Sequence, residues 1–126
     1  MAELFRQKDP KGVEIFCESE QWEQHVLTGH SMMKDNMEAV ISTIASPDYI
    51  HESHDSVPPG DYRIVYSKAE ESATYYAKTS YTKVIASVCG GSGELITAYA
   101  SRTAESGTMR DKEAIYIAER AAETEL

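Results

Sequence analysis

The hydrophobic period of the sequence changes at Pro47, and this change most constrains the fold. Before the proline, apolar residues recur with helical spacing, as in the stripe Met33, Met37, Val40, Ile41 and Ile44. Proline cannot continue this helix, because it lacks a backbone N–H and its ring clashes with the preceding turn. After it, apolar and polar residues alternate with the period of a strand, as over residues 61–67. We therefore expect helices first and a sheet after them.

A first helix is predicted over about residues 20–28, ahead of the apolar stripe. Ser19 is a candidate N-cap, with acids in the first turn where the helix dipole favours them. Gly29 suits the left-handed conformation that commonly ends a helix. Residues 13–17 alternate and include β-branched and aromatic side chains, which predicts a strand before this helix.

The clearest strand pattern is a hairpin over residues 81–89 and 94–100, joined by a glycine-rich turn at 90–93. The alternation predicts an apolar face with Thr82, Val84, Ala86, Val88, Ile96, Ala98 and Ala100. It predicts a mixed face with Lys83, Ile85, Ser87, Leu95, Thr97 and Tyr99. Such a face suits a shallow functional surface, and an ordinary solvated sheet face is the alternative.

The remaining segments complete an α+β fold: an N-terminal helix pair packed on a small antiparallel sheet, with a C-terminal helix. Residues 51–60 are expected as a polar loop, and residues 73–80 fit a strand or an ordered loop equally. From a candidate cap at Thr108, the apolar residues of the tail indicate an amphipathic helix. The predicted organisation is a domain over residues 13–101 followed by a helical extension over 102–126.

Length and charge limit the class of protein. The 126 residues are enough for one domain, and no run approaches the roughly 20 apolar residues that span a bilayer. The first ten residues lack the apolar core of a signal peptide, so a cytoplasmic protein is expected. The two cysteines form no CxxC pair, which argues against a disulfide framework or structural zinc.

The net charge of −9 opposes general nucleic-acid binding, because clustered Lys and Arg attract the phosphate backbone. The excess of acids is uneven, since residues 61–102 hold 4 acids and 5 bases. A local phosphate site in this stretch is therefore compatible with the composition, because charges more than about 8 to 10 Å away are largely screened at physiological salt.

The candidate chemical groups lie in the first helix and in the strands. His25 and His30 are the acid/base candidates, because histidine exchanges protons near neutral pH. Five helical positions rotate by about 500°, so these two side chains converge only if Gly29 ends the helix. The candidate phosphate ligands are Lys83 and Arg63, and the candidate hydrogen-bond donors are Thr97 and Tyr99.

The order of these patches resembles phage and bacterial nucleases of the BECR group (barnase, EndoU, colicin and RelE-like). The resemblance is carried by Trp-x-x-His-Val-x-x-x-His from Trp22, by the Pro-Asp-Tyr-Ile of residues 47–50, by the Tyr/Arg-rich strand after it, and by the segments 83–85 and 96–99. It implies a metal-independent endoribonuclease that cleaves RNA by acid/base transesterification without a cofactor. A toxin-like role is compatible with it.

These inferences predict one cleft shared by His30, Lys83, Thr97 and Tyr99, with His25 at its margin or beneath it. A structural role for His25 is the alternative. For the whole chain, the alternatives are an acidic protein-binding module, immunity-like or antitoxin-like, and an inactive BECR-like domain. The local charge near Lys83 and Arg63 discriminates between them.

No metal site is expected, because His51 and His54 face opposite ways on an extended segment and no further ligands cluster with them. The predicted partners are an RNA substrate and a protein partner or inhibitor, and no membrane. The sequence leaves the oligomeric state open.

Overall fold

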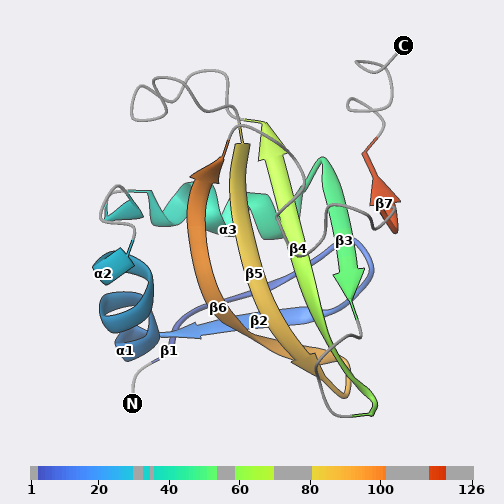
Figure 1. Ribbon diagram of the computed structural model, residues 1–126, viewed down its shortest axis with the longest axis horizontal. Coiled ribbons are helices and arrows are strands. Elements are labelled where there is room, and N and C mark those ends of the chain that lie inside the picture. The colour runs from blue at the N-terminus through green and yellow to red at the C-terminus, as the bar shows by residue number, and fades with distance from the viewer. Residues whose placement is uncertain are drawn as a thin grey trace.

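The chain folds around a seven-stranded mixed sheet with the strand order β1-β2-β6-β5-β4-β3-β7 (Figure 1). The computed structural model describes residues 3–29, 33–34, 36–53, 59–69, 81–101 and 114–118. The strands are Glu3–Lys8 (β1), Glu14–Glu18 (β2), Tyr49–Ser53 (β3), Asp61–Ala69 (β4), Tyr81–Cys89 (β5), Ser92–Ser101 (β6) and Tyr116–Ile117 (β7).

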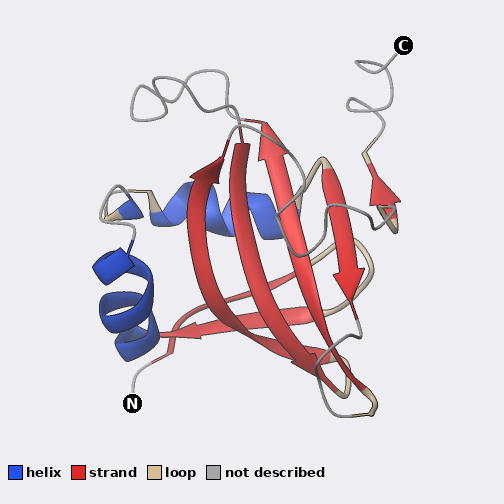
Figure 2. Ribbon diagram, in the orientation of Figure 1, coloured by secondary structure: helices blue, strands red, loops and turns tan. Residues whose placement is uncertain are grey.

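Most helical residues of the described chain lie in two stretches (Figure 2). In the first stretch, α1 (Ser19–Gln21), the π-helical turn η1 (Trp22–Val26) and α2 (Leu27–Gly29) follow one another directly. The second is α3 (Met37–Ala45), which lies against one face of the sheet and contacts β5, β4 and β1. In the described part of the chain, no helix has the length and hydropathy needed to cross a bilayer.

The hydrophobic core lies between α3, the first helical stretch and one face of the strands. Val40 and Ile44 of α3 and Trp22 of η1 are buried in one cluster with the strand residues Ile64 and Val84. The hairpin of β1 and β2 runs across the other strands in Figure 1 and adds further buried apolar residues to this cluster. The core therefore occupies the side of the sheet that faces α3.

The predicted fold class, a helix pair on a small antiparallel sheet with a C-terminal helix, is wrong. Residues 3–8 form β1, which the sequence interpretation did not include, and β2 pairs with β6 in parallel, Glu14 opposite Ser92. Among the described residues the longest helix, α3, has only nine residues. The sheet dominates because strand pairing between distant segments satisfies more backbone groups than the short helices do.

The tail departs from the predicted helix where it is described. Tyr116–Ile117 forms β7 on the edge of β3, and the N–H of Ile115 donates to the carbonyl of Ile50 over 2.7 Å. A strand edge presents a row of unpaired backbone groups, and pairing with them outweighs a weak helical pattern. The rest of the predicted extension, including Thr108, lies outside the described residues.

The first helical stretch covers Ser19–Gly29, close to the predicted residues 20–28, but the predicted N-cap and the predicted left-handed conformation of Gly29 are wrong. Ser19 is helical, and the N-cap is the extended Glu18, whose side chain makes no capping hydrogen bond. Gly29 ends the described helical stretch without a left-handed conformation, since the glycines with positive φ are Gly12, Gly60, Gly90 and Gly91. The helical conformation therefore reaches Gly29 unbroken.

The predicted hairpin is confirmed. β5 and β6 pair antiparallel from Cys89 opposite Ser92 to Tyr81 opposite Ser101. Gly90 (φ 64°) and Gly91 (φ 86°) form its turn, where both central residues need a positive φ that glycine adopts readily. The strand predicted over residues 61–67 is present as β4, whereas residues 51–53 of the expected loop belong to β3.

Candidate functional site

The polar side chains of the central strands gather on the side of the sheet opposite α3, which we call the polar face. This side faces the viewer in Figure 1, where α3 lies behind the strands. Side chains alternate across a strand, so the odd-numbered residues of β3, β4 and β5 share it. Its polar members include Tyr49, His51, Ser53, Asp61, Arg63, Ser67, Tyr81, Lys83, Ser87, Glu94, Thr97 and Tyr99.

Lys83 lies at the centre of the polar face. It is 1% exposed and stands between Ser67 on β4 and Tyr99 on β6. Thr97 is one register step away, opposite Ile85. Directly opposed residues have Cβ atoms about 4.5 to 5.5 Å apart, and diagonal neighbours lie about 7 to 8 Å apart. The register thus brings together three residues that the sequence assigned to one site.

Tyr99 and Thr97 border this lysine with partly accessible side chains. Both are half-buried, whereas Lys83 beside them is buried. Burial raises the pKa of the Tyr99 phenol above its usual range, since the phenolate loses hydration. The Tyr99 phenol therefore stays protonated at neutral pH and is able to donate a hydrogen bond.

A β-bulge in β6 corrects the predicted faces of the hairpin. Ile85 stands opposite Thr97 but Ala86 stands opposite Leu95, so Ile96 is the extra residue. Leu95 is consequently buried in the core rather than on the mixed face, and Ile96 is not a core residue. The Ile96 carbonyl accepts a 2.7 Å hydrogen bond from the Gln21 side chain, which attaches the first helical stretch to β6.

Arg63 lies on the polar face at a distance from Lys83. It is exposed and pairs with Ser87 on β5, four residues along that strand from Lys83. At about 3.4 Å per residue, the Cα atom opposite Arg63 is about 14 Å from that of Lys83. With their side chains directed straight out from the sheet, the two cations do not contact the same phosphate. Arg63 therefore suits a second anionic group of an extended ligand.

His25 lies outside this group, at the edge of the sheet. Its exposed side chain lines a hollow of about 230 Å³ together with Glu18, Glu20, Gln21 and Glu94. The surroundings are acidic, and η1 itself contacts β6. His30, its predicted partner, lies outside the described residues.

The sequence interpretation did not include His51 as a site residue. It is 4% exposed and lies on the polar face, in the row formed with Val65, Ile85 and Thr97 across β4, β5 and β6. The alternation of Tyr49, His51 and Ser53 could have indicated this strand. The loop expected from residue 51 divided the pattern and concealed it.

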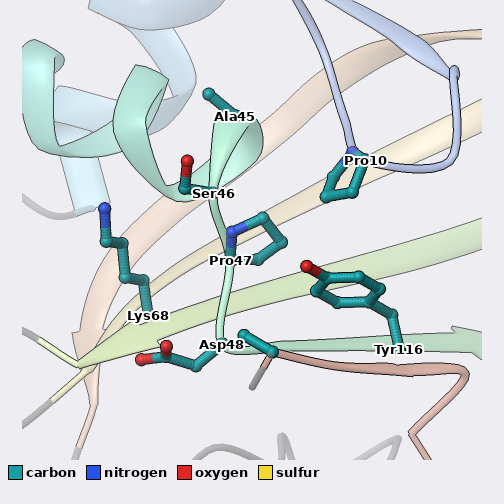
Figure 3. A pocket seen from close by; sticks show the side chains of 8 residues that line it. Pro10, Ala45, Ser46, Pro47, Asp48, Lys68 and Tyr116 are labelled. Atoms are coloured by element: carbon teal, nitrogen blue, oxygen red, sulfur yellow. The ribbon is translucent and has the colours of Figure 1, made fainter. Parts of the chain in front are cut away.

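A second hollow, of about 330 Å³, lies near the end of α3 (Figure 3). The picture shows Tyr116, Pro10 and Pro47 around it, with Lys68 and Asp48 at its side. Lys68 donates to the Ser42 hydroxyl over 2.6 Å, and Asp48 accepts the N–H of Ala69 over 2.8 Å. These charged groups thus have structural hydrogen bonds, and we do not place the site there.

Metal ligands do not gather in the described part of the chain: no group of three or more His, Cys, Asp or Glu side chains there is arranged to hold a metal ion. Comparison of the chain with known protein families, with curated proteins and with solved structures found no match.

Proposed function

We propose that this protein is a metal-independent RNA-cleaving domain of the BECR type, with its phosphate site on the polar face. The observation that carries the proposal is the register that sets Lys83 opposite Tyr99 and diagonal to Thr97. An ammonium group with two neighbouring hydroxyl donors matches the needs of a phosphate that gains charge in the transition state. The proposal also rests on the sequence resemblance described above.

The local charge supports this function over a purely acidic binding surface. Among the described residues of the polar face, Lys83 and Arg63 are cations. The acids Asp61 and Glu94 lie toward the β5–β6 turn, opposite Cys89 and Ser87. The centre of the face is therefore suited to an anion, although the whole chain carries a net charge of −9.

We assign proton transfer to His25 and His30, as the resemblance implies. Cleavage through the 2′-hydroxyl needs a base for that hydroxyl and an acid for the leaving oxygen. His25 lies outside the group of Lys83, Thr97 and Tyr99, in the acidic hollow at the sheet edge, so its role here rests on the resemblance alone. His51 lies on β3, three strands away from Thr97 on β6. Their backbones are therefore about 14 Å apart, too far for both side chains to act on the same phosphate.

The test is cleavage of single-stranded and hairpin RNA by the purified full chain in EDTA. The wild type is expected to cleave, and Lys83→Met, Thr97→Val and Tyr99→Phe are each expected to cleave at least about tenfold more slowly. These substitutions retain much of the side-chain volume. Tyr62→Phe, which changes a half-buried tyrosine on the opposite side of β4, is the matched control and should retain the wild-type rate.

Two results would overturn the proposal: no cleavage by the folded wild type, or equal rates for the wild type and all three polar-face variants. The alternative is then an acidic protein-binding module. Glu18, Glu20 and Glu94 around the His25 hollow favour that alternative, because together they suit a basic partner surface.

A further inference from the structure

The strand β7 forms one edge of the sheet and carries exposed apolar side chains. It is the last strand in the sheet order, at the right in Figure 1, and no described strand lies beyond it. Ile115, just before the strand, and Ile117, within it, are 39% and 46% exposed. The other edge strand, β1, contacts α3. An open edge presents unpaired N–H and C=O groups, so a further strand can pair at β7.

The sequence around β7 is self-complementary. Residues 114–118 are Ala-Ile-Tyr-Ile-Ala, which is the same in both directions, and none of them is charged. In an antiparallel pair of identical strands centred on the middle residue, the same residue types therefore face each other from both sides. Charged side chains are a common protection of an exposed strand edge, and this segment contains none.

The pairing with β3 determines the side of the sheet on which the isoleucines lie. The N–H groups at both ends of residues 115–118 donate to carbonyls of the chain at Ile50 and Asp48, which holds one edge of the segment in place. Ile117 stands opposite a residue of the polar face, and Ile115, two positions away, shares its side. Tyr116 points to the other side and packs against the core.

We propose that β7 pairs antiparallel with the β7 of a second copy of the chain, centred on Tyr116, so that two sheets join into one. Ile115 of each copy then stands opposite Ile117 of the other, and the four side chains lie together. Paired residues point to the same side of a sheet, so the polar faces of both copies lie on one side of the joined sheet. The contact has two-fold symmetry and closes at two copies. It does not depend on RNA cleavage.

Sedimentation velocity of the full chain measures this association. A contact limited to one short strand is smaller than the interfaces of stable dimers, so the average mass should rise toward twice that of the monomer between about 5 and 500 µM. Each copy carries a net charge of −9, and screening reduces the repulsion between them. Raising NaCl from about 20 to 200 mM should therefore tighten the dimer.

Variants assign the association to β7. Ile117→Lys is expected to stay monomeric over the whole range, and because it makes the chain less negative, added repulsion between copies cannot explain the loss. Ile117→Thr keeps a β-branched side chain and should weaken the dimer about tenfold, because apolar contact is lost. Leu4→Lys makes the same change at a side chain that is 40% exposed on β1, and this matched control should dimerise as the wild type does.

Disulfide crosslinking tests the register. In a Cys89→Ser background, Ile115→Cys and Ile117→Cys chains are mixed and oxidised with copper phenanthroline. The mixture should form crosslinked dimers several-fold faster than either variant alone. Directly opposed Cα atoms lie about 4.5 to 5.5 Å apart, within the span of a disulfide. Identical positions are diagonal neighbours about 7 to 8 Å apart, which exceeds it.

Each outcome decides the proposal. A monomer at every concentration, a dimer that persists in Ile117→Lys, or loss of the dimer in Leu4→Lys would overturn it. An assembly larger than two copies, or equal crosslinking of the mixture and the single variants, would contradict the closed antiparallel register. Denaturant unfolding checks that each variant is folded, and if Ile117→Lys is not, the comparison of Ile117→Thr with the wild type decides.

Discussion

Asp9 is a nearly buried carboxylate that joins the β1–β2 turn to the middle of the sheet. Its Oδ1 accepts the N–H groups of Lys11 (2.8 Å) and Val13 (2.9 Å), and its Oδ2 accepts the Tyr66 hydroxyl over 2.6 Å. The pKa of Tyr66 is raised well above its usual range, mainly by burial and then by this hydrogen bond. The phenol therefore stays protonated and connects β4 to the hairpin.

Removing this hydroxyl tests its contribution at the scale of a residue. Tyr66→Phe is expected to lower the free energy of unfolding by about 1.5 to 3 kcal/mol, because a buried hydrogen bond to a charged acceptor is lost. Urea unfolding measures the change. Tyr62→Phe on the same strand is the control, and an equal, small change in both variants would contradict the assigned role.

The same group gives stability a dependence on pH. Because the pKa of Tyr66 is raised in the folded state, its contribution is fully present below the unfolded tyrosine pKa of about 10 and is lost as pH rises above that value. We expect the free energy of unfolding to fall between about pH 10 and 11, with a smaller slope in Tyr66→Phe. Equal slopes in both proteins would argue against this linkage.

The two cysteines differ in accessibility, although the pKa of both thiols is raised, that of Cys89 by its hydrogen bond with Asp61. Cys17 is buried, and desolvation, followed by the nearby Glu94 and Glu18, raises its pKa to about 11, whereas Cys89 is exposed. With a thiol-reactive disulfide reagent at pH 8, we expect Cys89 to react promptly and Cys17 only after unfolding. In Cys89→Ser, rapid reaction should disappear, and a prompt reaction in this variant would show that Cys17 is accessible.

At the scale of elements, Gly93 determines how closely β6 approaches its neighbours. A Cβ at this position would lie 2.8 Å from Val88 Cγ2, 2.9 Å from Ile15 Cδ1 and 2.9 Å from the Ser87 carbonyl oxygen. Gly93 also pairs with Ile15 where β2 joins β6 in parallel. Only a residue without a side chain allows this junction to close.

Gly93→Ala is therefore expected to lower the free energy of unfolding by about 1 to 3 kcal/mol through overpacking. Gly29→Ala is the matched control, because a methyl group added there would meet nothing within 4 Å and the φ of Gly29 is not positive, so stability should stay the same or rise slightly. Guanidinium unfolding compares the two. If both substitutions were neutral, the close approach at Gly93 would be refuted.

At the scale of the whole molecule, the net charge of −9 acts against the compact state through self-repulsion. Arg6 pairs with Glu3 and Glu14 at exposed positions, and such surface ion pairs contribute little. Screening should therefore relieve more repulsion than attraction when salt is added.

We accordingly expect the Tm to rise when NaCl is increased from about 20 to 200 mM at constant neutral pH, a range over which the screening length falls several-fold. Calorimetry or circular dichroism follows the shift. Arg6→Gln should respond to salt as the wild type does, because its ion pairs are minor. A falling Tm would indicate that attractive charge pairs dominate.

The sequence by itself determined the features that depend on neighbouring residues. The β5–β6 hairpin, the end of α3 before Pro47, and the placement of Lys83, Thr97 and Tyr99 on one face follow from alternation, a glycine turn and the stereochemistry of proline. These properties are local, so the pattern of a few adjacent residues is sufficient to predict them.

Only the tertiary structure decided the features that depend on distant partners. The bulge at Ile96 moved Leu95 into the core, β1 and β7 added strands at the edges, and His51 became a buried member of the polar face. The longest-range of these pairings join β7 to β3 and residues 14–16 to residues 92–94. Short segments with little preference for helix or strand adopt the conformation that pairs their backbone groups and buries their apolar side chains. The pairing and the burial both depend on which other segments the fold places beside them.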